Sequence, residues 1–182
     1  RTSREREAAA VSLEEMTLLA KSARAEIVDV ISQERKRPDS ATYFGSGKVD
    51  ELKELVTAKE ITIVMVDAEL SPVQARNLEA KLDVKVLDRT ELILDIFAQR
   101  ARSREGRLQV ELAQLQYLMP RLTGKGVSLS RLGGGIGTRG PGETKLEIGR
   151  RRAKERVSFL EAQLKKLSRQ REQRRRKRAR KD

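Results

Sequence analysis

Ile-Thr-Ile-Val-Met-Val, at residues 61–66, is the strongest apolar run of this chain and indicates its class of fold. A continuous apolar run of this kind, rich in β-branched residues, is typical of a strand buried on both faces of a parallel sheet. The residues on either side have the 3–4 spacing of helices, at about 48–59 and 71–82. Parallel strands need such crossovers, so the sequence predicts an α/β fold with a small parallel sheet and flanking helices.

The first hundred residues alternate helix and strand, and we expect three or four strands in one domain over residues 1–103. Ser12, with Glu15 three residues later, has the pattern of a helix N-terminus. Ser71-Pro72 has the pattern of another helix start, with proline in the first turn. The remaining expected elements are a helix at 12–24, strands at 25–32 and 84–87, and a helix that Asp88 caps.

The pattern changes after about residue 101, and residues 104–182 predict a long antiparallel helical hairpin resembling a coiled coil. Two apolar seams with 3–4 spacing are separated by a glycine-rich segment. The first seam consists of Leu108, Leu112, Leu115, Met119 and Leu122. The second seam consists of Leu146, Gly149, Ala153, Val157, Leu160, Leu164 and Leu167, and a basic helix or tail follows it.

The glycine-rich segment at residues 131–145, between the two seams, is the candidate binding site. Glycine lets the backbone approach a ligand closely, and the basic residues of the segment favour an anionic ligand. RNA is the expected ligand, because arginine, lysine and backbone N–H groups bind phosphate oxygens. A flexible linker is the alternative, although linkers are usually richer in serine. The predicted RNA-binding residues are Arg131, Gly133, Gly134, Gly135, Gly137, Thr138, Arg139, Gly140, Pro141, Gly142, Glu143, Thr144, Lys145, Arg150, Arg151 and Arg152.

Composition supports a polyanionic partner and excludes several classes of site. The chain has a formal net charge of +13 and a pI of about 10.4, which favours nucleic acid. It has no Cys and no His, which excludes disulfides, thiol chemistry, the usual zinc sites and histidine-based catalysis. Aromatic residues make up only 3% of the chain, which argues against base-stacking RNA-binding domains. No apolar run approaches the length of a membrane span.

Two nucleotide-binding motifs are matched only superficially. Residues 135–140 read G-x-G-x-x-G, but a leucine-seamed helix precedes them where a dinucleotide site needs a strand. Gly45-Ser-Gly-Lys48 lacks the first glycine and the hydroxyl residue of a P-loop. The acidic residues near the expected strand ends have the pattern of caps and surface charges rather than of a catalytic pair. We therefore predict no catalytic residues, no cofactor site and no metal site in this segment.

Several motifs together resemble the HflX GTPases. They are Thr-Tyr-Phe-Gly-Ser-Gly-Lys-Val at 42–49, Leu-Ser-Pro-Val-Gln-Ala-Arg-Asn-Leu-Glu at 70–79, Asp-Arg-Thr-Glu-Leu-Ile-Leu-Asp-Ile-Phe-Ala-Gln-Arg-Ala at 88–101, Leu-Gln-Val-Glu-Leu-Ala-Gln-Leu at 108–115 and Gly-Gly-Ile-Gly-Thr-Arg-Gly-Pro-Gly-Glu-Thr-Lys-Leu-Glu at 134–147. They occur in the family's order and cover nearly the whole chain. The chain departs from the family pattern at Lys145, where Gln is usual, and at Gly149, where Asp is usual.

The resemblance implies a ribosome-binding module of a cytoplasmic protein that splits or rescues ribosomes under stress. It implies that the glycine-rich segment reaches large-subunit rRNA near the peptidyl-transferase centre. GTP and Mg²⁺ are then expected in a G domain that would follow this segment, so the full-length protein is expected to be a GTPase. We also expect a monomer. Two alternatives remain: an α/β domain that binds a nucleotide such as ATP, and a coiled-coil arm that binds a protein or tRNA.

Overall fold

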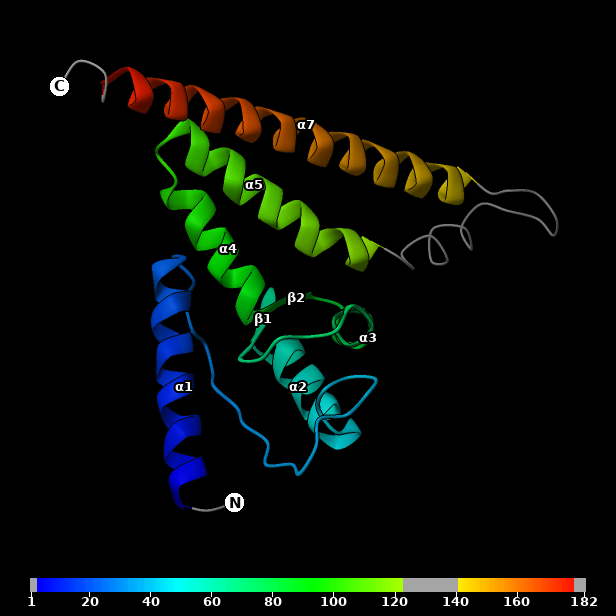
Figure 1. The fold of residues 1–182 in the computed structure, drawn as a ribbon. Helices are drawn as coiled ribbons and strands as arrows, with labels where there is room; N and C mark the ends of the chain where they lie inside the picture. Colours follow the sequence, from blue (N-terminus) through cyan, green and yellow to red (C-terminus); the bar gives the residue numbers. More distant parts are fainter. Residues whose placement is uncertain (1–2, 123–140, 179–182) are drawn as a thin grey trace. The chain divides into compact units, whose positions relative to one another are not determined.

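The computed structural model describes residues 3–122 and 141–178, in two compact units (Figure 1). The first unit is Arg1–Gln99 and the second is Arg100–Asp182. The elements of the first unit are α1 (Ser3–Ser22), α2 (Ser46–Ala58), β1 (Ile63–Val66), α3 (Pro72–Leu82), β2 (Lys85–Asp88) and α4 (Arg89–Arg100). The second unit contains α5 (Arg104–Leu118), a 3-10 helix η1 (Met119–Leu122) and α7 (Pro141–Arg178).

A parallel sheet lies at the centre of the first unit, as the sequence predicts. β1 pairs with β2 in a register that runs from Ile63 opposite Lys85 to Val66 opposite Asp88. Helix α3 is the crossover between these strands. The α/β class is confirmed, but the described residues form two strands rather than three or four.

Two apolar cores cover opposite faces of β1. Val64 and Val66 pack against a cluster built mainly from α2, α3 and β2, with Leu78 completely buried. Met65 packs against a second cluster, in which Met16 and Ala20 of α1 meet α4. Successive side chains of a strand point to opposite faces, so α2 and α3 lie on one face of β1 and α1 and α4 on the other.

The prediction of a strand at residues 25–32 is wrong. The chain from 25 to 31 follows an extended course beside α1 (Figure 1), but it belongs to no sheet, because no strand among the described residues pairs with its backbone. Val28 and Val30 are about half exposed. The apolar β-branched residues therefore produce an extended backbone here without a strand partner.

The start of the first helix is also predicted wrongly. Helix α1 begins at Ser3, nine residues before the expected cap at Ser12. Ser12 lies inside the helix and its hydroxyl donates to Asp67 at 2.6 Å. Glu15 pairs with Arg89 at 2.6 Å rather than completing a capping box.

Two other predicted caps are confirmed. Ser71 forms a capping box with Gln74: each side chain accepts a hydrogen bond from the other residue's backbone N–H, and Pro72 occupies the first turn. Asp88 accepts from the backbone N–H of Glu91 at 2.9 Å, at the start of α4. These signals are local, so they can be recognised without knowledge of the tertiary structure.

The second unit is the predicted antiparallel hairpin. Glu111 of α5 pairs with Arg156 of α7, and Glu105, earlier in α5, pairs with Arg171, later in α7. This order of contacts requires the two helices to run in opposite directions. Leu160 is completely buried, and the seam residues Ala153, Val157, Leu164 and Leu167 are partly buried. Helix α7 has 38 residues, which corresponds to about 57 Å at 1.5 Å per residue.

None of the helices in the described part of the chain combines the length and the apolar character needed to cross a membrane.

Candidate nucleic-acid interface

The predicted binding residues fall into two groups. The first group lies outside the described residues and consists of Arg131, Gly133, Gly134, Gly135, Gly137, Thr138, Arg139 and Gly140. The second group belongs to α7 and consists of Pro141, Gly142, Glu143, Thr144, Lys145, Arg150, Arg151 and Arg152. The site is therefore described on the side of α7 alone.

Helix α7 begins at Pro141, two residues before the start expected near Glu143. Proline suits the first helical position, because its missing N–H would have no partner inside the helix there. The first N–H groups of an α-helix lack partners within the helix and favour anions. The glycine-rich segment thus leads directly into a helix start that favours negative charge.

Arg150, Arg151 and Arg152 lie on α7, about two and a half to three turns beyond its start, and all three are exposed. Successive helical residues are about 100° apart, so three of them spread over much of the helix circumference. Arg151 contacts Glu155 at 3.8 Å, with both side chains about 70% exposed. So exposed a pair is weak, and it leaves the Arg151 guanidinium accessible to a phosphate.

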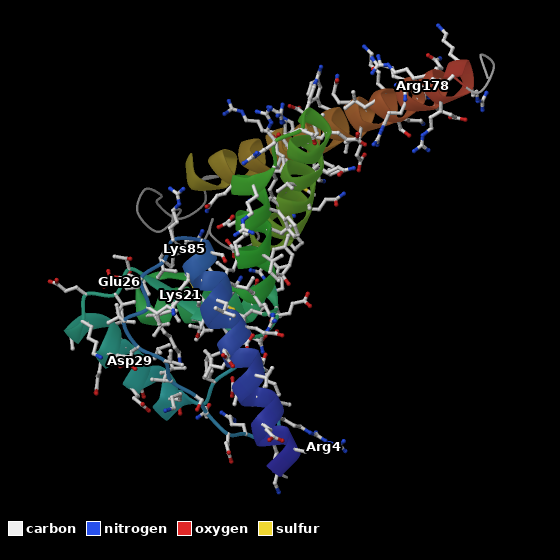
Figure 2. All side chains as sticks on the ribbon, turned by 90° about the vertical axis from the view of Figure 1, so that its left-hand side faces the viewer. Arg4, Lys21, Glu26, Asp29, Lys85 and Arg178 are labelled. Carbon is white, nitrogen blue, oxygen red and sulfur yellow. The ribbon has the colours of Figure 1, made fainter. Side chains whose placement is uncertain are left out.

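A second basic surface, which we call the basic end of α7, covers its last turns (Figure 2). Every residue from Ser168 to Arg178 is exposed. Two of its arginines pair with carboxylates, Arg171 with Glu105 at 2.8 Å and Arg176 with Glu172 at 2.5 Å. The basic residues of this surface are Arg169, Arg171, Arg174, Arg175, Arg176, Lys177 and Arg178. A helix end that is polar all round contributes no apolar core.

An ion pair links the two helices of the hairpin, beside the buried Leu160. Arg156 donates to both carboxylate oxygens of Glu111, at 2.6 and 2.9 Å. These hydrogen bonds lower the pKa of Glu111 and raise the pKa of Arg156. Arg156 also lies 5.3 Å from the Phe159 ring centre. This arginine therefore acts in the hairpin itself, unlike those at 150–152.

Arg121 marks the end of the described part of the first arm. Its guanidinium lies 4.1 Å from the ring centre of Tyr117, and one of its nitrogens donates to the tyrosine hydroxyl at 2.6 Å. These two residues are not among the predicted binding residues, although the i, i+4 spacing on a helix brings such side chains together.

The first unit has a pocket at the start of α2, beside Gly45-Ser-Gly-Lys48. The pocket has a volume of about 650 Å³, and its lining includes Arg35, Asn77 and Lys81. Gly45 caps α2 without a side-chain hydrogen bond, and the Arg35 guanidinium occupies the space that a Cβ at position 45 would need. Lys48 pairs with Glu51 at 2.7 Å. The pocket carries two cationic side chains, Arg35 and Lys81, and one acidic side chain, Asp39, and it does not reproduce a P-loop.

The acidic residues near the strand ends have structural roles. Asp88 is fully buried and accepts from the backbone N–H groups of Leu70 and Glu91. Asp83 ends α3 in the left-handed conformation, at φ 58°. Asp67 accepts from Arg89 at 2.7 Å and from Ser12.

Arg89 is the centre of an ion-pair cluster that the sequence does not reveal. It binds Asp67 beyond β1 and Glu15 on α1, and these hydrogen bonds raise its pKa. Its partners are 22 and 74 residues away in sequence, so no local spacing indicates the cluster.

Comparison with known proteins places this architecture in a family. Residues 10–98 match the family described as GTP-binding GTPase N-terminal, and residues 100–178 match the GTP-binding GTPase Middle Region. The chain is similar to the GTPase HflX of Caldanaerobacter subterraneus (53% identical over 88% of this chain and 37% of that protein) and of Escherichia coli K12 (48% identical over 93% and 40%). The chain thus spans well under half the length of these relatives.

Solved structures agree with the sequence relatives. A GTP-binding protein from the archaeon Sulfolobus solfataricus in complex with GDP matches with a TM-score of 0.60 and 25% identity, over 85% of this chain and 42% of that one. The SsGBP–GDP complex matches with a TM-score of 0.66 and 25% identity, over 88% and 42%. Together with the two matched regions, these similarities show that the chain belongs to the HflX family of GTPases, of which it comprises the N-terminal and middle regions.

Proposed function

We propose that this chain is the ribosome-binding part of an HflX-type GTPase and that its hairpin presents residues 131–145 to large-subunit rRNA. The observation that carries the proposal is the set of three exposed arginines that follows the first turns of α7. The glycine-rich segment leads into a helix N-terminus, and Arg150, Arg151 and Arg152 are exposed about two and a half to three turns further along. Phosphate groups are the ligands that such an arrangement favours.

The hairpin is suited to support this contact. Its arms are held together by the buried Leu160 and by the pairs Glu111–Arg156 and Glu105–Arg171. Two packed helices resist bending better than one, so binding energy gained at residues 131–145 is not lost in ordering the arms. We propose contact near the peptidyl-transferase centre and a role in splitting or rescuing ribosomes in the cytoplasm, with this segment acting as a wedge.

The same proposal assigns GTP chemistry to the rest of the protein. GTP and Mg²⁺ would bind in a G domain outside this segment, since Gly45-Ser-Gly-Lys48 lacks the P-loop residues and Lys48 is paired with Glu51. We expect the segment to be a monomer and to hydrolyse no GTP.

Co-sedimentation with isolated large and small ribosomal subunits, over a series of salt concentrations, tests the proposal. The variant carries Arg139→Glu and Gly137→Ala, and the matched control carries Lys53→Glu, a charge reversal at an exposed site in α2. We expect binding to the large subunit that withstands moderate salt, is lost in the variant and is kept in the control.

Two other results would assign the binding to a different part of the chain. Equal binding to both subunits that collapses as salt rises, unchanged in the variant, would mean that the basic end of α7 alone attaches to RNA. Loss of binding in Leu160→Asp but not in the Arg139 and Gly137 variant would instead favour a helical arm that recognises a protein or tRNA. Either result would overturn the assignment to residues 131–145.

A second candidate function is binding of a nucleotide such as ATP in the α2 pocket. The observation that favours it is a pocket of about 650 Å³, with Arg35 and Lys81 as well as Asp39 in its lining, at a helix start that lacks a side-chain cap. Equilibrium dialysis with ATP tests this function. Saturable binding below about 1 mM that is weakened by Lys81→Gln, and not by Lys53→Gln outside the pocket, would support it.

A further inference from the structure

The apolar seams of the hairpin give way to arginines on both helices. On α7 the 3–4 spacing that reaches Leu167 continues without a break through Arg171, Arg174 and Arg178. On α5 the residue one turn before the first seam leucine is Arg104. Residues at these steps lie on one face of a helix. The face that packs the two helices together therefore becomes cationic at the base of the hairpin, where α5 begins and α7 ends.

One ion pair brings two basic segments side by side at this base (Figure 1). Arg171 of α7 donates to Glu105 of α5 at 2.8 Å. The basic residues on both sides of this pair are exposed, and Glu105 and Glu172 are the carboxylates that residues 102–107 and 168–178 contain. The resulting surface, which we call the hairpin-base patch, consists of the basic end of α7 together with Arg102, Arg104 and Arg107.

The basic side chains surround the end of α7 instead of forming a single stripe. Residues 174–177 are all basic, and successive helical residues are about 100° apart, so these side chains spread over about 300° of the helix circumference. Figure 2 shows side chains projecting on several sides of α7 near Arg178. An acidic protein surface would meet such a helix on one side only. The phosphates of a nucleic-acid duplex line both sides of a groove, and this distribution of charge therefore favours a duplex.

We propose that the hairpin-base patch is a second RNA-binding site, which holds the phosphates of an RNA duplex without regard to base sequence. It rests on the proposed function in taking RNA as the partner, but the contact is separate from residues 131–145. Arg175 lies 34 residues after Pro141, which corresponds to about 51 Å along α7. Contacts to phosphates fix position and carry no sequence information. Attachment at both ends of the hairpin strengthens binding, because the second contact forms within one complex.

Binding of the full-length protein to a labelled RNA duplex of about 16 base pairs, measured by fluorescence anisotropy over a salt series, tests the proposal. The base variant carries Arg174→Gln, Arg175→Gln and Arg178→Gln. We expect its binding to be weaker by about tenfold or more, and its slope of log K against log salt to be smaller by about 2 to 3. The matched control replaces three exposed lysines of the first unit with Gln, at positions 21, 36 and 53, and should keep both values. The circular dichroism of both variants at 222 nm should equal that of the parent, because the replaced side chains are exposed.

Three results would overturn the proposal. The first is unchanged binding in the base variant, and the second is an equal loss in the base variant and the lysine control. The third is competition by polyglutamate as effective as that by unlabelled duplex of the same charge, which would assign the patch to an acidic protein.

The variant with Arg139→Glu and Gly137→Ala separates this proposal from the proposed function. It should bind the duplex as the parent does, because the hairpin-base patch is intact. Duplex binding that is lost in the base variant alone would support the second site even if residues 131–145 prove not to contact the large subunit. Duplex binding that is lost in the Arg139 and Gly137 variant, and kept in the base variant, would overturn the second site and leave the proposed function standing.

Discussion

The buried side chain of Asp88 forms hydrogen bonds with two separate segments of the first unit. Its two carboxylate oxygens accept from the backbone N–H groups of Glu91 and Leu70, at 2.9 and 3.1 Å, and its side chain is fully buried. It also ends β2, opposite Val66 of β1. One side chain thus connects the sheet, the loop before α3 and the start of α4.

Replacing Asp88 with Ala should destabilise the protein by about 3 kcal/mol, because two buried N–H groups lose their acceptor and α4 loses its cap. Chemical denaturation followed by circular dichroism measures the change. Asp50→Ala, at an exposed position of α2, is the control and should change the free energy of unfolding by less than about 0.5 kcal/mol. Equal effects of the two substitutions would contradict the structural role of Asp88.

The ion pair between Glu111 and Arg156 is the residue-scale contact that should respond to pH. Hydrogen bonds from Arg156 hold the pKa of Glu111 below its ordinary value. A carboxyl whose pKa is lowered by folding contributes stability above its unfolded pKa, near 4.3, and loses that contribution as the pH falls through the lowered folded pKa. The contribution is modest, since both side chains are 40% exposed or more.

A double-mutant cycle with Glu111→Gln and Arg156→Gln measures this pair. We expect a small favourable coupling at pH 7 that disappears once the pH falls below the folded pKa of Glu111. High salt should weaken the coupling at pH 7. A coupling that persists in strong acid would show that the contact is not an ion pair.

At the scale of the elements, Gly149 is the residue of α7 that is hardest to explain by packing. It belongs to the apolar seam in sequence, and close approach of the two arms would account for a glycine there. The structure does not support this explanation: Gly149 is exposed, and a Cβ at this position would have no neighbour within 4 Å. Nothing in the described part of the chain requires glycine at this point of the helix.

Gly149→Ala should therefore stabilise α7, by up to about 1 kcal/mol, because alanine has the higher helix propensity. Thermal unfolding followed by circular dichroism at 222 nm measures the effect. Gly45→Ala is the contrasting variant and should not stabilise, because Gly45 is the N-cap of α2, where glycine is preferred to alanine, and the end of the Arg35 side chain would have to move aside. A loss of stability in Gly149→Ala would mean that α7 has a close neighbour here in solution.

At the scale of the whole molecule, the excess of positive charge should make binding to rRNA weaken as the salt concentration rises. If Arg150, Arg151 and Arg152 contact phosphates, replacing all three with Gln should reduce the slope of log K against log salt for rRNA binding by about 2 to 3. Fluorescence anisotropy with a labelled large-subunit rRNA fragment gives the slope. Lys21, Lys36 and Lys53, all exposed in the first unit, form the control set with the same change in net charge. Equal slopes for the two triple variants would show that charge alone, and not its place on α7, governs binding.

Local patterns were sufficient to predict much of this fold. The apolar run at 61–66 predicts β1, Ser71-Pro72 predicts the start of α3, and the leucine seams predict α5 and α7. Each of these signals depends on neighbours within a few residues or on a repeat along one helix. The glycine-rich segment is equally recognisable in sequence, and its proposed contact with RNA stays a prediction, because residues 123–140 lie outside the described chain.

The wrong predictions, at the start of α1 and at residues 25–32, depend on contacts between residues that are distant in sequence. Ser12 looks like a cap, but it lies inside α1, where Asp67 accepts its hydroxyl and Arg89 binds Glu15. Residues 25–31 have strand composition but no strand, because a strand forms only where a neighbouring backbone is present to pair with it. The alternation of apolar and polar residues therefore determines which segments are helical or extended, whereas pairing, burial and ion-pair partners depend on which segments the folded chain brings side by side.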